Sequence, residues 1–117
     1  MALEDQFVYE IKCAIIDDSV NRYIKFIQER SETDVEDDDW SRFAVALHEK
    51  GAIECSATVF RHIIVDVVAN ILGILDGSSN LETLRGDIRV VYDGRSLDPT
   101  LSEIFWESEQ EDHQNQD

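Results

Sequence analysis

The chain has 117 residues, and its 26 acidic residues against 10 basic ones give a formal net charge of −16. A chain of this length forms one domain with a modest core, for which 43% apolar residues are sufficient. The electrostatic field of such a charge repels nucleic acids and anionic membranes and attracts basic proteins. We therefore expect no binding to DNA or RNA and no association with membranes.

Apolar residues recur at helical spacing through residues 4–30. Polar residues at 17–19, in the middle of this stretch, could cap a second helix, so one bent helix and two helices are alternatives. Residues 31–39 contain six acids and are predicted to form a polar, acidic loop. A helix is predicted at residues 40–50, and the acidic residues before it would stabilise its positive N-terminal end. Gly51 is predicted to end this helix.

The most apolar segment covers about residues 57–75 and is predicted to be the central helix of the fold. Ser56 is its expected N-cap. On a helical wheel most of its circumference is apolar, which predicts burial on most sides. Polar residues interrupt the apolar run, so a membrane span is not predicted. A narrow arc of small and polar residues contains Thr58, His62, Asp66, Ala69, Asn70 and Gly73.

The period of the apolar pattern changes after this helix. Residues 80–85 could form a short helix that begins with a capping box. Residues 88–97 are predicted to form a β-hairpin, because Asp93 and Gly94 between strand-like residues favour a type I′ turn.

Asp98 and Pro99 are predicted to begin a last amphipathic helix. The polar residues from about 109 to 117 are predicted to form a disordered tail. The predicted fold is a single domain over residues 1–117, of the α+β class and mainly α. It has about four helices packed around the central helix, one short hairpin and a C-terminal helix.

His62 and Asp66 are about one helical turn apart, so their side chains can form a hydrogen bond. A carboxylate that holds an imidazole is the arrangement of a general base or of a metal-bound histidine, and Asn70 could orient a substrate. The same pair could instead satisfy its own polar groups at the edge of a core helix. An enzymatic or small-ligand site at these three residues is thus one hypothesis, but no nucleophile accompanies them and an enzyme is not favoured.

No metal site and no cofactor are predicted. The chain lacks the Cys and His spacings of a structural zinc site, and its glycines form no phosphate-binding loop. Cys13 and Cys55 are predicted to be buried free thiols, with a disulfide between them as the alternative. The N-terminus has no secretory signal, so a cytoplasmic location is expected.

Two tryptophans stand beside the acidic segments. An aromatic anchor among carboxylates suits an interface with a basic partner, because the ring supplies burial and the carboxylates supply steering. Ordinary boundary positions would explain the same two residues. The predicted partner-binding residues are Glu32, Asp34, Glu36, Asp37, Asp38, Asp39, Trp40 and Trp106.

The sequence therefore predicts a small acidic binding protein that recognises a basic protein. In size and charge alone, the chain is similar to bacterial immunity proteins, which neutralise cationic nuclease toxins. A regulatory protein, a DNA mimic and a homodimer are the alternatives. The homodimer would pack through the 57–75 helix, since so apolar a helix in so small a chain could need cover from a second subunit.

Overall fold

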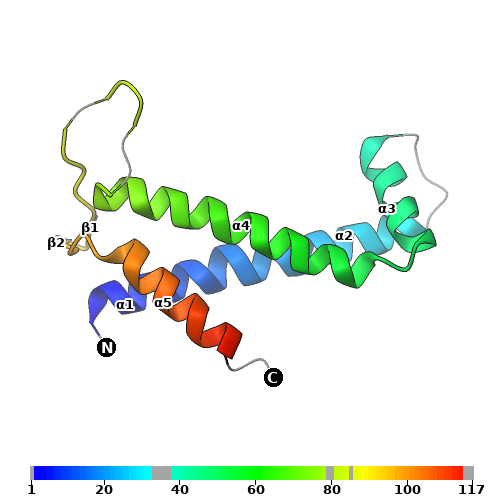
Figure 1. The fold of residues 1–117 in the computed structure, drawn as a ribbon, viewed down its shortest axis with the longest axis horizontal. Coiled ribbons are helices and arrows are strands. Elements are labelled where there is room, and N and C mark those ends of the chain that lie inside the picture. Colours follow the sequence, from blue (N-terminus) through cyan, green and yellow to red (C-terminus); the bar gives the residue numbers. More distant parts are fainter. Residues whose placement is uncertain (1, 33–37, 79–80, 85, 115–117) are drawn as a thin grey trace. The chain divides into compact units, whose positions relative to one another are not determined.

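The computed structural model of the chain is mainly helical, with one two-stranded hairpin and a C-terminal helix (Figure 1). This architecture confirms the predicted mainly helical α+β class. The Cα positions divide the chain into two compact units, which are residues 1–12 with 65–117 and residues 13–64. The prediction of a single domain stays a prediction. The described residues are 2–32, 38–78, 81–84 and 86–114.

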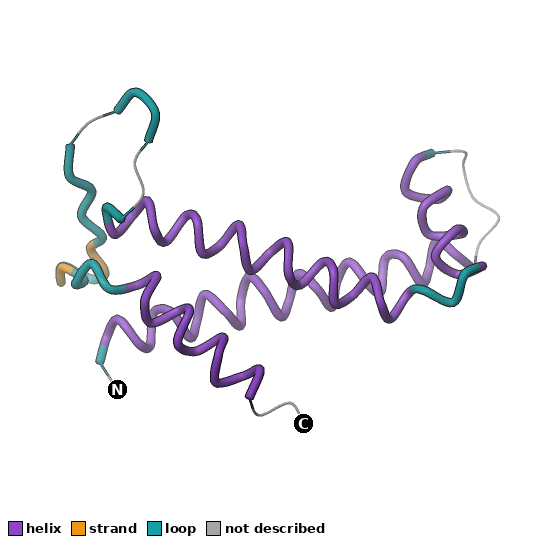
Figure 2. Tube along the Cα trace, in the orientation of Figure 1, coloured by secondary structure: helices purple, strands orange, loops and turns teal. Residues whose placement is uncertain are grey.

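The N-terminal helical run has no break (Figure 2). It begins with α1 (Leu3–Ile11), continues through the π-helical segment η1 (Lys12–Asp17) and ends with α2 (Asp18–Glu32). The alternative of two separate helices is therefore wrong, because the chain stays helical through residues 17–19. A π-helical segment widens the turn within an α-helix and is frequent at functional sites.

Helix α3 (Asp39–Glu49) packs against α2. Asp38 caps its N-terminus, because its carboxylate accepts a hydrogen bond of 2.7 Å from the backbone N–H of Ser41. The acidic loop predicted at 31–39 is therefore too long, since helices and a cap take up both of its ends. Residues 33–37 lie outside the described residues.

Helix α4 (Ile53–Asp76) is a single helix of 24 residues (Figure 1). It begins four residues before the predicted 57–75 helix. Ser56 is therefore not the N-cap, because its N–H already donates a helical hydrogen bond of 2.9 Å to the carbonyl of Ala52. The two ends of α4 belong to different units, and its N-terminal part contributes to the unit of residues 13–64.

The burial of α4 differs from the helical-wheel prediction. Ala69 and Gly73, which the wheel placed in the polar arc, are buried. A row of large apolar residues is instead 51–55% exposed, so the prediction of burial on most sides is wrong for this row. A wheel shows which residues share a face but not whether a neighbour covers that face. The exposed row contains Val59, Ile63, Val67 and Ile71.

By length and apolar composition alone, α4 could cross a membrane, and among the described residues no other helix meets this test. The core helix of a soluble protein meets the same test. The predictions of no membrane contact and of a cytoplasmic location therefore stay predictions.

The residues between α4 and the hairpin are not helical where they are described. The short helix predicted at 80–85 is wrong for residues 81–84, since so few residues give too few hydrogen bonds to offset helix nucleation. Strands β1 (Val91–Tyr92) and β2 (Arg95–Ser96) pair antiparallel, which confirms the hairpin predicted at 88–97 in a shorter form.

The hairpin turn depends on left-handed backbone at Asp93 and Gly94, whose φ angles are +49° and +77°. No atom would contact a Cβ at Gly94, so only the backbone conformation opposes a side chain there. We expect Gly94→Ala to lower the free energy of unfolding by about 1 kcal/mol, measured by urea denaturation. Ser96→Ala on β2 is the control. Equal stability of the Gly94→Ala variant and the wild type would contradict the type I′ turn.

Helix α5 (Leu101–Gln114) packs against α1 within its unit. Its first turn is joined to the end of α4, where Oδ2 of Asp76 accepts a hydrogen bond of 2.7 Å from the N–H of Ser102. The helix start predicted at Asp98 and Pro99 is thus two or three residues too early, because the carboxylate of α4 satisfies this N–H from a distant part of the chain.

The C-terminal tail predicted at 109–117 is wrong for residues 109–114, which are helical. Glu109 is buried and Phe105 has no exposed surface, so this helix contributes to the core of its unit. Residues 115–117 lie outside the described residues.

Candidate protein-binding surface

Five aromatic rings from α2, α3 and α4 gather in the unit of residues 13–64. The ring centroid of Trp40 lies 5.5 to 6.4 Å from those of Tyr23, Phe26 and Phe43. Phe60 completes the cluster, at 6.2 Å from Tyr23 and 6.1 Å from Phe43. Ring pairs at such distances stabilise one another beyond their buried area. The sequence indicated Trp40 alone, because helical spacing does not show which distant rings meet.

Part of this cluster is open to solvent. The exposed fractions of Tyr23, Trp40 and Phe43 are 40–44%. The guanidinium of Arg30 lies 4.3 Å from the ring centroid of Phe26, a distance at which a cation is attracted to an aromatic face. The exposed rings are thus held by their neighbours. Exposed aromatic surface of this kind marks protein interaction sites.

Two predicted partner-binding acids border these rings, and they differ in their surroundings. Asp38 accepts hydrogen bonds from Ser41 and from Arg30, the latter at 2.9 Å. The hydrogen bonds from Ser41, and after them Arg30, hold the pKa of Asp38 below its ordinary value of 3.8. Asp39 has a fully exposed side chain, 3.7 Å from the guanidinium of Arg42. Asp39 is therefore more available to a partner than Asp38.

The lowered pKa of Asp38 predicts a pH dependence of the α3 N-terminus. A carboxyl group whose folded pKa lies below its unfolded value stabilises the fold above the unfolded pKa, and this contribution is lost as the pH falls through the folded pKa. We expect the helical circular dichroism of the wild type to fall with acid, and Asp38→Asn to remove that part of the titration. Asp39→Asn is the matched control. If Asp38→Asn titrated like the wild type, the assignment of the cap would be wrong.

The other predicted partner-binding residues are not shown at this surface. Trp106 lies on α5 in the other unit, where it is 44% exposed and 5.7 Å from the ring of Phe105. Glu32 is the last residue of α2, and its side chain is not described. The predicted residues outside the described part of the chain are Asp34, Glu36 and Asp37.

His62, Asp66 and Asn70 lie exposed on α4. A pocket of about 740 Å³ occurs elsewhere, between the end of α4 and the hairpin, and its lining residues fall between Ile74 and Pro99. This pocket therefore gives no support to a catalytic or small-ligand site at the three residues, which stays a prediction.

The described residues bring no group of three or more His, Cys, Asp or Glu side chains together as metal ligands would lie. Both cysteines are free thiols. Cys13 is partly buried, but Cys55 is exposed, so the prediction of burial is wrong for Cys55. Cys55 lies in the first turn of α4, and apolar neighbours in the sequence do not show which side of this turn is covered.

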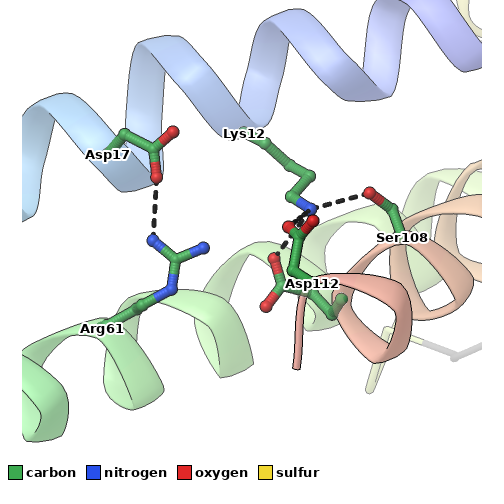
Figure 3. A network of polar contacts seen from close by, with 6 residues as sticks. Lys12, Asp17, Arg61, Ser108 and Asp112 are labelled. Atoms are coloured by element: carbon green, nitrogen blue, oxygen red, sulfur yellow. Dashed lines mark hydrogen bonds and ion pairs between the residues drawn. The ribbon is translucent and has the colours of Figure 1, made fainter. Parts of the chain in front are cut away.

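A buried ion-pair network that the sequence did not indicate joins η1 to α5 (Figure 3). Nζ of Lys12 donates hydrogen bonds of 2.7 Å to Oγ of Ser108 and 2.6 Å to Oδ2 of Asp112, and it lies 3.1 Å from Oε1 of Glu109. Burial by itself lowers the pKa of Lys12, but the hydrogen bonds with Asp112 and Glu109 outweigh it and place the pKa above the ordinary 10.5. No local pattern predicts partners about one hundred residues apart.

The last residue of η1 also forms an ion pair. In the unit of residues 13–64, Nη1 of Arg61 lies 2.8 Å from Oδ1 of Asp17 (Figure 3). Both ends of the π-helical segment are therefore tied to another helix. Because Lys12 and Glu109 are buried, we interpret the network at the first end as structural.

Comparison of the chain with known protein families, with curated proteins and with solved structures found no match. The function is therefore argued from the geometry and charge of the residues described above.

Proposed function

We propose that this chain is a small acidic binding protein that recognises a basic protein. The contact region is the Trp40 surface, which we define as Tyr23, Asp39, Trp40 and Phe43. The observation that carries the proposal is the exposure of 44% of Trp40 although its ring packs on three others. A fixed, exposed tryptophan loses little conformational entropy on binding, and tryptophans dominate the binding energy of many interfaces.

Charge supports a basic partner. The chain carries a net charge of −16, and a field of this size raises the encounter rate with positively charged proteins. The exposed carboxylate of Asp39 stands next to the anchor residue. Binding is therefore expected to be fast at low salt and to weaken as salt screens the field.

The test uses the immobilised full-length chain and a lysate of its source organism, at low and at high salt. The variant is Trp40→Ala, and the matched control is Tyr92→Ala, an exposed aromatic on the hairpin. We expect the wild type and the control to retain the same basic proteins and Trp40→Ala to bind them at least about 30-fold more weakly, the effect of a hot-spot residue. Circular dichroism checks that the variants are folded.

Retained proteins that are not basic, or that bind Trp40→Ala as well as the wild type, would contradict the proposal. Trp106→Ala separates the two tryptophans predicted as anchors, since we expect it to bind like the control. Asp39→Asn is expected to slow association and to reduce the salt dependence, with a smaller effect on dissociation.

Once the basic partner is isolated, duplex DNA distinguishes the alternatives within this proposal. A DNA mimic occupies the partner's nucleic-acid site, so excess duplex DNA would displace it. An immunity-like protein would abolish a nuclease activity of the partner, and a regulatory protein would do neither. Each outcome is read from one competition experiment and one nuclease assay on the same complex.

A further inference from the structure

The exposed side of α4 carries two parallel rows of residues, each with a spacing of four. Rows of this spacing are the ridges with which helices pack into one another's grooves. The apolar ridge is 51–55% exposed over its whole length, and about three turns of such surface are unusual on a small acidic chain. The apolar ridge consists of Val59, Ile63, Val67 and Ile71. The polar ridge beside it consists of Thr58, His62, Asp66 and Asn70.

We propose that a second copy of this chain covers the apolar ridge, with the two α4 helices antiparallel. The order of the ridge is Val, Ile, Val, Ile, so an antiparallel copy places a valine opposite an isoleucine at every level. Val59 would face Ile71 of the partner subunit, and Ile63 would face Val67 of the partner subunit. A surface that is complementary to its own reverse is what a two-fold symmetric interface requires.

The polar ridge has the same self-complementarity in its hydrogen-bonding groups. In the antiparallel arrangement, His62 lies within one turn of Asp66 of the partner subunit, and by symmetry Asp66 lies near the partner subunit's His62. Two reciprocal contacts of acceptor with donor thus flank the apolar contact. Packing of four-spaced ridges from both helices gives a crossing angle near −50°, with the closest approach at Ile63 and Val67.

The chemistry of this face fits a copy better than the other occupants. A basic protein would meet only one acid on the polar ridge, Asp66. A lipid bilayer would have to accommodate His62, Asp66 and Asn70 beside the apolar ridge, and such groups are costly at membrane depth. The dimer buries the apolar ridge and keeps the polar ridge among polar groups.

The dimer also responds to salt in the opposite direction from the proposed recognition of a basic protein. Each copy carries a charge of −16, so salt screens the repulsion between copies and strengthens an apolar interface. Salt weakens the attraction between this chain and a basic partner. The failure of either proposal therefore leaves the other one to be judged on its own data.

The first experiment is sedimentation equilibrium of the full-length chain at low and at high salt. We expect a monomer–dimer equilibrium that shifts towards dimer with salt. Ile63→Gln with Val67→Gln is expected to weaken it at least about tenfold per substituted side chain, since glutamine keeps helix propensity but loses the apolar contact. Leu84→Gln is the matched control, because Leu84 is an exposed apolar residue outside α4.

The second experiment tests the orientation, in a background in which Cys13 and Cys55 are replaced by serine. Val59→Cys combined with Ile71→Cys is expected to form a covalent dimer on oxidation, while either substitution alone is not. Within one helix these positions are about 18 Å apart, too far for a bond inside one chain. Covalent dimers of a single-cysteine variant would show a parallel arrangement and overturn the proposal.

Three further results would also overturn it. The first is a monomer at every protein and salt concentration. The second is unchanged association of the doubly substituted variant. The third is stable binding of the wild type to neutral phosphatidylcholine vesicles through α4. The last would be seen as binding that the doubly substituted variant loses and Leu84→Gln keeps. It would assign the apolar ridge to a membrane instead of a second subunit.

Discussion

Replacing Lys12 by alanine is expected to lower the free energy of unfolding by about 3–5 kcal/mol, the cost of breaking a buried ion pair by removing one partner. The side chains of Lys12 and Glu109 are only 8% and 5% exposed, so the substitution would leave the carboxylate of Glu109 in the interior without its cation. Asp112 is half exposed, so its contact with Lys12 contributes much less. Urea denaturation followed by circular dichroism measures the change.

The control for this prediction removes both charges. Lys12→Met with Glu109→Leu replaces the ion pair by apolar side chains of similar length, and such replacements are often neutral or stabilising. We therefore expect the double variant to recover most of the stability that Lys12→Ala loses. Equal stabilities of Lys12→Ala and the double variant would show that the loss comes from packing of the lysine stem and not from the buried charge.

The same network has a pH dependence whose direction follows from the raised pKa of Lys12. A lysine whose folded pKa lies above its unfolded value stabilises the fold at every pH below the unfolded pKa. The contribution is lost as the pH rises through the folded pKa, which here lies above 10.5. The wild type should therefore lose more stability in strong alkali than the double variant without these charges.

The elements that the sequence predicted well are those with local causes. The hairpin was predicted because an Asp-Gly pair favours the positive φ angles of a type I′ turn, and Asp93 and Gly94 do take positive φ angles. This preference belongs to the two residues themselves. The end of α3 was predicted in the same way, since Gly51 has a φ of +64° just past the helix. Such signals do not depend on how distant parts of the chain pack.

The features that the sequence did not predict depend on distant residues. The start of α5 was placed too early because Asp76 of α4 supplies its first-turn acceptor across 26 residues. The exposed row on α4 was expected to be buried because its residues are apolar. Apolar character does not show whether a neighbouring element covers that side of the helix. For the candidate surface, the sequence indicated Trp40 and its acids, while the rings that pack on Trp40 come from α2 and from a position one turn further along α3.

The second large effect is expected at Phe105, where substitution by alanine should lower the free energy of unfolding by about 3–5 kcal/mol. The side chain has no exposed surface and lies on α5, which packs against α1. Truncation would remove its apolar burial and leave a cavity that close-packed neighbours fill only in part. The measurement is the same urea denaturation, followed by circular dichroism.

The adjacent residue provides a matched comparison. Trp106 follows Phe105 on the same helix but is 44% exposed, so Trp106→Ala removes a larger ring whose contacts are partly with water. We expect it to cost about 1 kcal/mol, the typical effect of a substitution outside the core. The smaller ring is therefore predicted to have the larger effect. If the two substitutions cost the same, α5 would be bound too loosely for burial to distinguish its two sides, and the Lys12 network could not be anchored to it.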